Sequence, residues 1–201
     1  MGELSSWPSW EERYREQPVE DMPWYSTELD EDLLTALRSR EISAGHILDI
    51  GTGPGTQALE LARLGFEVTA TDLSESAIEH CCQLPGQEDL EIDWRVDDIL
   101  NSQLSPSFDF IFDRGCFHVF PPEKRSVYIR TLRVLLHSGG LLFLKTFDKK
   151  EPRPEGPQRF HPEELRELFQ RDFEILGIEE TVYQGKLQPP PLALFAVMRR
   201  R

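Results

Sequence analysis

The stretch Ile47-Leu48-Asp49-Ile50-Gly51-Thr52-Gly53-Pro54-Gly55-Thr56, followed by Glu67-Val68-Thr69-Ala70-Thr71-Asp72, decides the fold of this chain. An apolar run ends in a glycine-rich turn and a helical pattern follows. A second apolar run then ends in a carboxylate 21 positions after Gly51. This spacing predicts two parallel strands joined by a helix, with a first turn where a ligand can approach the backbone. Glycine suits such a turn because a Cβ would block the ligand.

Patterns typical of strands and helices alternate along the rest of the chain, with no internal repeat or domain boundary. Apolar runs predict strands, whereas apolar residues three and four apart predict helices. The expected strands are 46–50, 67–71, 91–96, 108–113, 141–147, 173–183 and 192–198. The expected helices are 28–40, 56–64, 74–83, 121–136 and 161–171, the fourth of them closed by a turn at 137–140. The alternation predicts a single α/β domain over residues 1–201, with a mostly parallel sheet and helices on both faces.

The composition argues against several classes of function. A formal net charge of −14 disfavours nucleic-acid binding, which requires lysine and arginine to neutralise phosphates. No apolar run approaches the ~18 residues of a membrane span, and the acidic start is not a signal peptide, so we expect a cytoplasmic protein without membrane contact. The three cysteines have neither disulfide nor metal spacing, so no metal is expected. The acidic surface favours a monomer or a weak homodimer.

Polar residues follow four of the predicted strands at the point where each strand ends. In sheets of this kind, ligands bind beyond the carboxyl ends of the strands, near the point where strand order reverses. The candidate segments are 51–55, 72–73, 97–99 and 113–118. We expect them to form one site for a small molecule.

The glycine spacing separates two classes of cofactor-binding turn. Nicotinamide and flavin enzymes use G-x-G-x-x-G, whereas this chain has G-x-G-x-G with Asp49 two residues before the first glycine. This string resembles the first motif of the class I S-adenosylmethionine-dependent methyltransferases, and the resemblance covers residues 42–199. It implies a Rossmann-like doubly wound sheet of about seven strands with S-adenosylmethionine as the cofactor and S-adenosylhomocysteine as the product. A nicotinamide enzyme is the less favoured alternative.

The resemblance assigns most of the cofactor-binding residues. Asp72 would accept hydrogen bonds from the ribose hydroxyls, because charge-assisted bonds are strong. Asp98 would accept from the adenine amino group, with Asp97 as its competitor. Ile99 would pack the adenine ring and offer its backbone N–H, and Leu73 would cover the other face of the ring.

The glycine turn itself would hold the methionine portion of the cofactor. Gly51 and Gly53 would approach it through their backbone, and Gly55 completes the motif. Asp49 would hold loop amides or reach the ammonium group through water, because a buried carboxylate needs partners.

A second set of short segments narrows the resemblance. These are Asp113-Arg114-Gly115-Cys116-Phe117-His118, Trp10-Glu11-Glu12-Arg13-Tyr14, Pro23-Trp24 and Gly156-Pro157. They resemble small-molecule methyltransferases of the thiopurine and thiol methyltransferase type. That resemblance implies an antiparallel last strand and a helical arm over residues 1–41 that folds over the cofactor as a lid. Trp24 would belong to the cofactor site, and Trp10 and Tyr14 would help it to exclude water.

Arg114 and His118 are the candidate catalytic residues. Arg114 would pair with a carboxylate, either that of the cofactor or an internal acid such as Asp113. His118 is the available general base, although a place in the wall of the site is the stronger interpretation. Cys116 lies two residues from His118, but nothing else in the sequence supports covalent catalysis by this thiol.

These features predict methyl transfer to a small-molecule acceptor by in-line displacement, with a thiol or another soft nucleophile preferred. Such a reaction mainly requires alignment and exclusion of water. O- or N-methylation of a small metabolite is the enzymatic alternative. A cofactor-binding partner protein without catalytic activity is the other alternative. The long proline- and charge-rich loop 148–160 and the amino-terminal arm would determine the acceptor.

Overall fold

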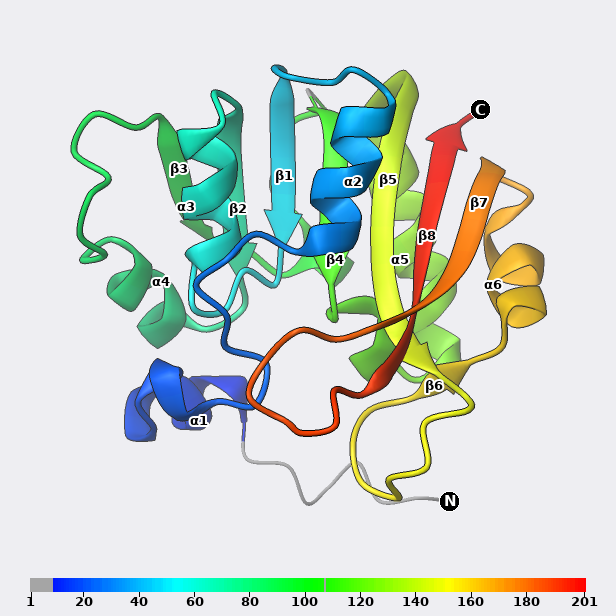
Figure 1. Ribbon diagram of the computed structural model, residues 1–201. Helices are drawn as coiled ribbons and strands as arrows, with labels where there is room; N and C mark the ends of the chain where they lie inside the picture. Colours follow the sequence, from blue (N-terminus) through cyan, green and yellow to red (C-terminus); the bar gives the residue numbers. More distant parts are fainter. Residues whose placement is uncertain (1–8, 107) are drawn as a thin grey trace.

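The computed structural model describes residues 9–106 and 108–201, and its described strands join in one sheet (Figure 1). The strand order is β3-β2-β1-β4-β5-β8-β7, with the short β6 paired to β5. The strands are β1 (His46–Ile50), β2 (Glu67–Asp72), β3 (Ile92–Val96), β4 (Phe108–Arg114), β5 (Leu136–Asp148), β6 (Arg159–Phe160), β7 (Phe173–Val182) and β8 (Leu192–Arg200). Strand order reverses between β1 and β4, which is the expected place for a ligand.

The pairing directions confirm the predicted fold class. β1 pairs in parallel with both β2 and β4, and β4 pairs in parallel with β5. The last strand, β8, runs antiparallel to β5 and β7. The sheet is therefore mostly parallel with an antiparallel last strand.

Helices cover both faces of the sheet (Figure 1). They are α1 (Trp10–Glu16), α2 (Glu31–Ser39), α3 (Thr56–Arg63), α4 (Glu75–Cys81), α5 (Pro122–Leu135) and α6 (Pro162–Phe169). Because side chains alternate along a strand, neighbouring residues of β1 enter different cores. Ile47 packs with apolar residues of α2 and α3, whereas Leu48 packs with those of α5 and α6.

The connection from α5 to β5 differs from the prediction. A turn was expected at 137–140, but β5 begins at Leu136 directly after the helix. Leu136 is fully buried and pairs with Phe108 of β4, with a register irregularity before the next paired residue. The four residues 137–140 lie opposite the single residue Asp109, and Gly139 has a φ of 80°, so they form a bulge within β5 rather than a separate turn.

The amino-terminal arm consists of α1, a 3₁₀ turn at Val19–Asp21 and α2. Residues 1–8 of the predicted arm lie outside the described residues. Helix α1 packs against α4, next to the carboxyl ends of β1 and β2 (Figure 1). No helix in the described ranges is both long and apolar enough to cross a membrane.

Candidate functional site

The glycine turn after β1 has the backbone conformation that its sequence predicts. Gly51, Gly53 and Gly55 have φ of 64°, 52° and 74°, which L-residues with a side chain rarely adopt. A Cβ placed on Gly53 would lie 2.4 Å from the hydroxyl oxygen of Tyr14. The turn is therefore open to a close approach by other groups, and in this structure Tyr14 makes that approach.

Asp72 joins the turn to the end of β2. Its Oδ2 accepts a hydrogen bond from the Gly53 N–H at 2.9 Å, and its Oδ1 accepts one from the Ser74 N–H at 2.9 Å. Burial raises the pKa of Asp72 above its usual value, against the effect of these amides. A carboxylate has about four acceptor positions, so two amide bonds leave capacity for two hydroxyl donors.

Asp49 is buried below the turn, and its carboxylate accepts a hydrogen bond from a side chain rather than from the expected loop amides. The Thr52 hydroxyl donates to Asp49 Oδ2 at 2.6 Å. Burial raises the pKa of Asp49 to about 7, more than the Thr52 bond lowers it. The charged form of Asp49 is thus disfavoured in the folded chain.

This raised pKa predicts a pH dependence of stability. Asp49 has a higher pKa when folded than its unfolded value of 3.8, so its contribution to stability is full below pH 4 and is lost as pH rises to about 7. The slope is at most about 1.4 kcal/mol per pH unit in that window. Asp49→Asn should flatten the profile, measured by urea unfolding from pH 4 to 8. An unchanged slope in the variant would show that Asp49 does not titrate there.

The two acids after β3 have different environments. Asp97 is half-buried and accepts from the Gln103 N–H at 2.9 Å, which ties it to the following loop. Asp98 is exposed and begins the 3₁₀ turn Ile99–Asn101, accepting from the Leu100 N–H at 3.0 Å. The exposure of its carboxylate supports Asp98, rather than Asp97, as the group available to a ligand.

The two apolar residues assigned to the adenine lie in contrasting places. The Leu73 side chain is 59% exposed at the end of β2, where a ligand could cover it. The side chain of Ile99 is buried in the core beside α5. Ile99 therefore presents little side-chain surface to a ligand in this structure.

The amino-terminal arm is anchored beside these residues through Glu11. Its carboxylate accepts from the Ser74 hydroxyl at 2.8 Å and from the Ser76 hydroxyl at 2.5 Å, at the start of α4. The rings of Trp10 and Trp24 pack edge to face, with centroids 5.9 Å apart. A Cβ on Gly53 would also lie 3.8 Å from Trp24 Nε1, so the arm stands over the glycine turn.

The turn after β4 is organised by Asp113. Its Oδ1 accepts from the N–H groups of Gly115 at 2.8 Å and Cys116 at 2.7 Å, and its Oδ2 accepts from that of Phe117 at 2.8 Å. The Tyr128 hydroxyl of α5 donates to the same Oδ2. Burial raises the pKa of Asp113 to about 6 in spite of these bonds.

Arg114 pairs with an internal acid, and that acid is Asp30 rather than Asp113. Its Nε donates to Asp30 Oδ2 at 3.0 Å, and its other nitrogens donate to the carbonyls of Trp24 and Gln184. The guanidinium thus fastens the arm and the segment after β7 to the sheet. All three of these hydrogen-bond acceptors belong to the protein itself, so in this structure Arg114 holds these segments in position.

A buried lysine that the sequence analysis missed completes this network. Lys145 of β5 has a fully buried side chain and donates to Asp30 at 2.7 Å and Asp32 at 2.6 Å. It also donates to Gln184 Oε1 at 2.9 Å. A lysine within an apolar strand pattern, which requires a buried counter-charge, was the available signal.

His118 lies in an aromatic wall near the same turn. Its ring stacks on Phe147 with centroids 4.9 Å apart and lies edge-on to Tyr183. Burial lowers the pKa of His118 to about 3, so the imidazole is neutral near pH 7. Its Nδ1 is buried and has no hydrogen-bond partner among the described residues. These properties suit a wall residue better than a general base.

The fold therefore brings together most of the predicted site residues at one edge of the sheet. The glycine turn, Asp72, Leu73 and Asp98 follow β1, β2 and β3, and Trp24 reaches them from the arm. Asp49 lies beneath the turn, Arg114 is the last residue of β4, and His118 lies in the turn that follows β4. These features fit a nucleoside with a small charged tail. They are the exposed apolar surface of Leu73, the spare acceptor positions of the Asp72 carboxylate, and a turn whose glycines have no side chain.

Comparisons with known proteins agree with this geometry. Residues 47–140 match the family described as a methyltransferase domain. An uncharacterized methyltransferase of Schizosaccharomyces pombe is 30% identical over 105 residues, which are 52% of this chain and 72% of that protein. The EEF1A lysine methyltransferase 2 of Danio rerio is 29% identical over 163 residues, 76% of this chain and 65% of the relative.

A solved structure resembles nearly the whole chain. It comes from work on the conversion of a disulfide bond into a thioacetal group during echinomycin biosynthesis. Its TM-score is 0.81 at 25% identity, and the match covers 94% of this chain and 89% of that chain.

Proposed function

The chain belongs to the S-adenosylmethionine-dependent methyltransferases, and we propose that it methylates a small-molecule acceptor, preferably a thiol or another soft nucleophile. When bound, the cofactor supplies a methyl group on a sulfonium, whose thioether is a good leaving group. The protein then has to orient the two reactants and exclude water. The assignment to the thiopurine and thiol methyltransferase type belongs to this proposal.

The buried, neutral His118 is the observation that carries the acceptor preference. A thiol is partly ionised near neutral pH without assistance, whereas an amine or a hydroxyl requires removal of a proton. With a pKa of about 3, His118 is a weak base. Burial also raises the pKa of Cys116, so this thiol is not a ready nucleophile. An acceptor that arrives as a thiolate needs neither group.

Each site residue has a distinct task under this proposal. Asp72 binds the ribose, Asp98 the adenine amino group, and the glycine turn the methionine portion. Tyr14 and Trp24 close the site from the arm, and closure removes water that would compete with the acceptor. Arg114 keeps the arm in place through its bond to the Trp24 carbonyl.

The solved structure associated with disulfide-to-thioacetal conversion supports chemistry at sulfur. The relative named as a lysine methyltransferase of EEF1A supports a different acceptor, the amine of a protein lysine. This second candidate is an N-methyltransferase, and it would need a deprotonated amine. The two candidates differ in acceptor and in their demand for a base.

An acceptor comparison tests the proposal. We expect kcat/KM for thiophenol at pH 7.5 to exceed that for phenol by about 100-fold, because the thiol is far more ionised there. We also expect His118→Gln to reduce kcat/KM for thiol methylation less than about tenfold. Loss of a general acid or base usually reduces a rate by about 100-fold or more. S-Adenosylhomocysteine release is the readout, and circular dichroism verifies folding. Methylation of a lysine peptide but of no thiol would contradict the proposal and favour the N-methyltransferase.

A further inference from the structure

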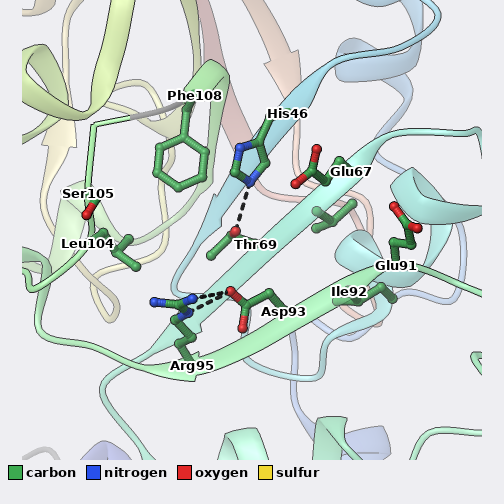
Figure 2. Close-up of a pocket in the computed structure, with 11 residues that line it drawn as sticks. His46, Glu67, Thr69, Glu91, Ile92, Asp93, Arg95, Leu104, Ser105 and Phe108 are labelled. Carbon is green, nitrogen blue, oxygen red and sulfur yellow. Dashed lines mark hydrogen bonds and ion pairs between the residues drawn. The ribbon is translucent and has the colours of Figure 1, made fainter.

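A solvent-open groove lies on the sheet outside the cofactor site (Figure 2). Its volume is about 560 Å³ and its residues come from β1, β2, β3, the start of β4 and the segment before it. His46 and Glu67 are the first residues of β1 and β2. The groove therefore lies toward the amino ends of the strands, whereas the cofactor site is at their carboxyl ends.

The groove exists because part of one sheet face has no helix over it. Val68 and Ile92 point to the face covered by α3 and α4, so Thr69 and Asp93, one residue later, point to the other face. The apolar core that contains α5 on that other face includes residues of β1, β4, β5 and β8, and among the described residues it includes none of β2 or β3. Between β3 and β4 the described chain forms a 3₁₀ turn at Ile99–Asn101 and otherwise irregular structure. The side chains left uncovered on β2 and β3 are polar rather than apolar.

The two glutamates of this groove, Glu67 and Glu91, lie on one side of it, and Leu104 lies on the other (Figure 2). Asp93 pairs with Arg95 at 2.6 Å, so their charges offset each other. Within the described residues, neither the Glu67 carboxylate nor the Glu91 carboxylate has a hydrogen-bond or ion-pair partner; both residues bond through their backbone only. The groove therefore carries a surplus of negative charge beside an apolar side chain.

We propose that the groove docks a basic segment of a partner protein. A lysine or arginine of that segment would pair with Glu67 and Glu91, and a neighbouring apolar side chain would contact Leu104. The four charged residues that line the groove are exposed, so the groove is open; they are Glu67, Glu91, Asp93 and Arg95. Small-molecule sites usually enclose most of their ligand, whereas an open groove suits a polypeptide that lies across it. A second copy of this chain, also with a net charge of −14, lacks the complementary charge.

The test uses the full-length protein and a fluorescein-labelled peptide of alternating lysine and leucine. Fluorescence anisotropy would measure its binding at physiological ionic strength, where exposed charges are partly screened. The paired substitution Glu67→Gln and Glu91→Gln should weaken binding about tenfold, because each removes an ion pair from the peptide. The matched control is Glu163→Gln with Glu167→Gln, which removes the same charge from exposed positions on α6.

The outcomes are distinct. A loss of peptide affinity in the Glu67→Gln and Glu91→Gln variant alone, with unchanged methyl transfer, supports the proposal. An equal loss of peptide affinity in the control variant would mean that net charge alone attracts the peptide, and it would overturn the proposal. The absence of saturable binding to the unmodified protein would also overturn it. Displacement of the peptide by spermidine at equal concentration would assign the groove to small polyamines instead. Thermal unfolding of both pairs verifies that each variant is folded.

Discussion

Replacing Asp72 with alanine is expected to weaken the binding of S-adenosylhomocysteine by about 100-fold. Hydrogen bonds to a charged group contribute about 1.5–3 kcal/mol each, and this carboxylate has room for two ribose hydroxyls. The same residue holds the Gly53 and Ser74 amides, so its loss also loosens the turn. Both effects reduce affinity for the cofactor.

Calorimetric titration measures this change, with Glu75→Ala as the matched control. Glu75 is an exposed carboxylate at the start of α4, three residues from Asp72. The control should bind the ligand as the unmodified protein does. Thermal unfolding without ligand separates lost affinity from lost folding. Unchanged affinity in a folded Asp72→Ala variant would show that the ribose lies elsewhere.

Asp30→Ala is expected to lower the free energy of unfolding by about 3–5 kcal/mol, because it leaves the buried Arg114 without its carboxylate and Lys145 with Asp32 alone. Asp30 Oδ2 accepts from both Lys145 and Arg114, and its Oδ1 accepts from the N–H groups that begin α2. Burial alone would raise the pKa of Asp30, but the charges of Lys145 and Arg114 lower it. Asp30 is therefore ionised in the folded chain.

Urea unfolding measures the effect, and Glu31→Ala is the control. Glu31 is the exposed neighbour of Asp30, and its replacement should lower the free energy of unfolding far less. Adding Lys145→Met to Asp30→Ala removes one of the two buried cations that lose the Asp30 carboxylate. The double variant should therefore recover part of the lost stability. If Asp30→Ala were no more destabilising than the control, the network would not hold the arm and the sheet together.

The sequence predicted those parts of the molecule that depend on local pattern. The strand 46–50 matches β1 at both ends, and the glycine turn has the positive φ values expected of it. These features follow from neighbouring residues, because side-chain alternation and glycine chemistry act over a few positions. The position of the site at the carboxyl ends of the strands then follows from topology.

Contacts between distant parts of the chain could not be predicted in the same way. Lys145 and Asp30 are 115 positions apart, and no local pattern indicates that they meet. The carboxylate that pairs with Arg114 could not be predicted for the same reason, because Asp30 is distant in the sequence whereas Asp113 is adjacent. The start of β5 at Leu136 depends on pairing with Phe108, a distant residue in the sequence, and Gly139 and Gly140 then lie in a bulge within the strand.

The state of His118 likewise depends on tertiary packing. Its position two residues after Cys116 gives no indication of whether the ring is exposed to water. Stacking on Phe147 and burial lower its pKa, and this changes the candidate role from base to wall. The proposed preference for a thiol acceptor therefore rests on a contact between β5 and the turn after β4.

Titration calorimetry of the unmodified protein with S-adenosylhomocysteine, and separately with NADH, tests the central claim most directly. The account predicts saturable binding of S-adenosylhomocysteine at about one site per chain with a dissociation constant on the order of micromolar, and no binding of NADH. Binding of NADH alone would assign the glycine turn and Asp72 to a nicotinamide cofactor. Binding of neither compound would contradict the proposed cofactor site.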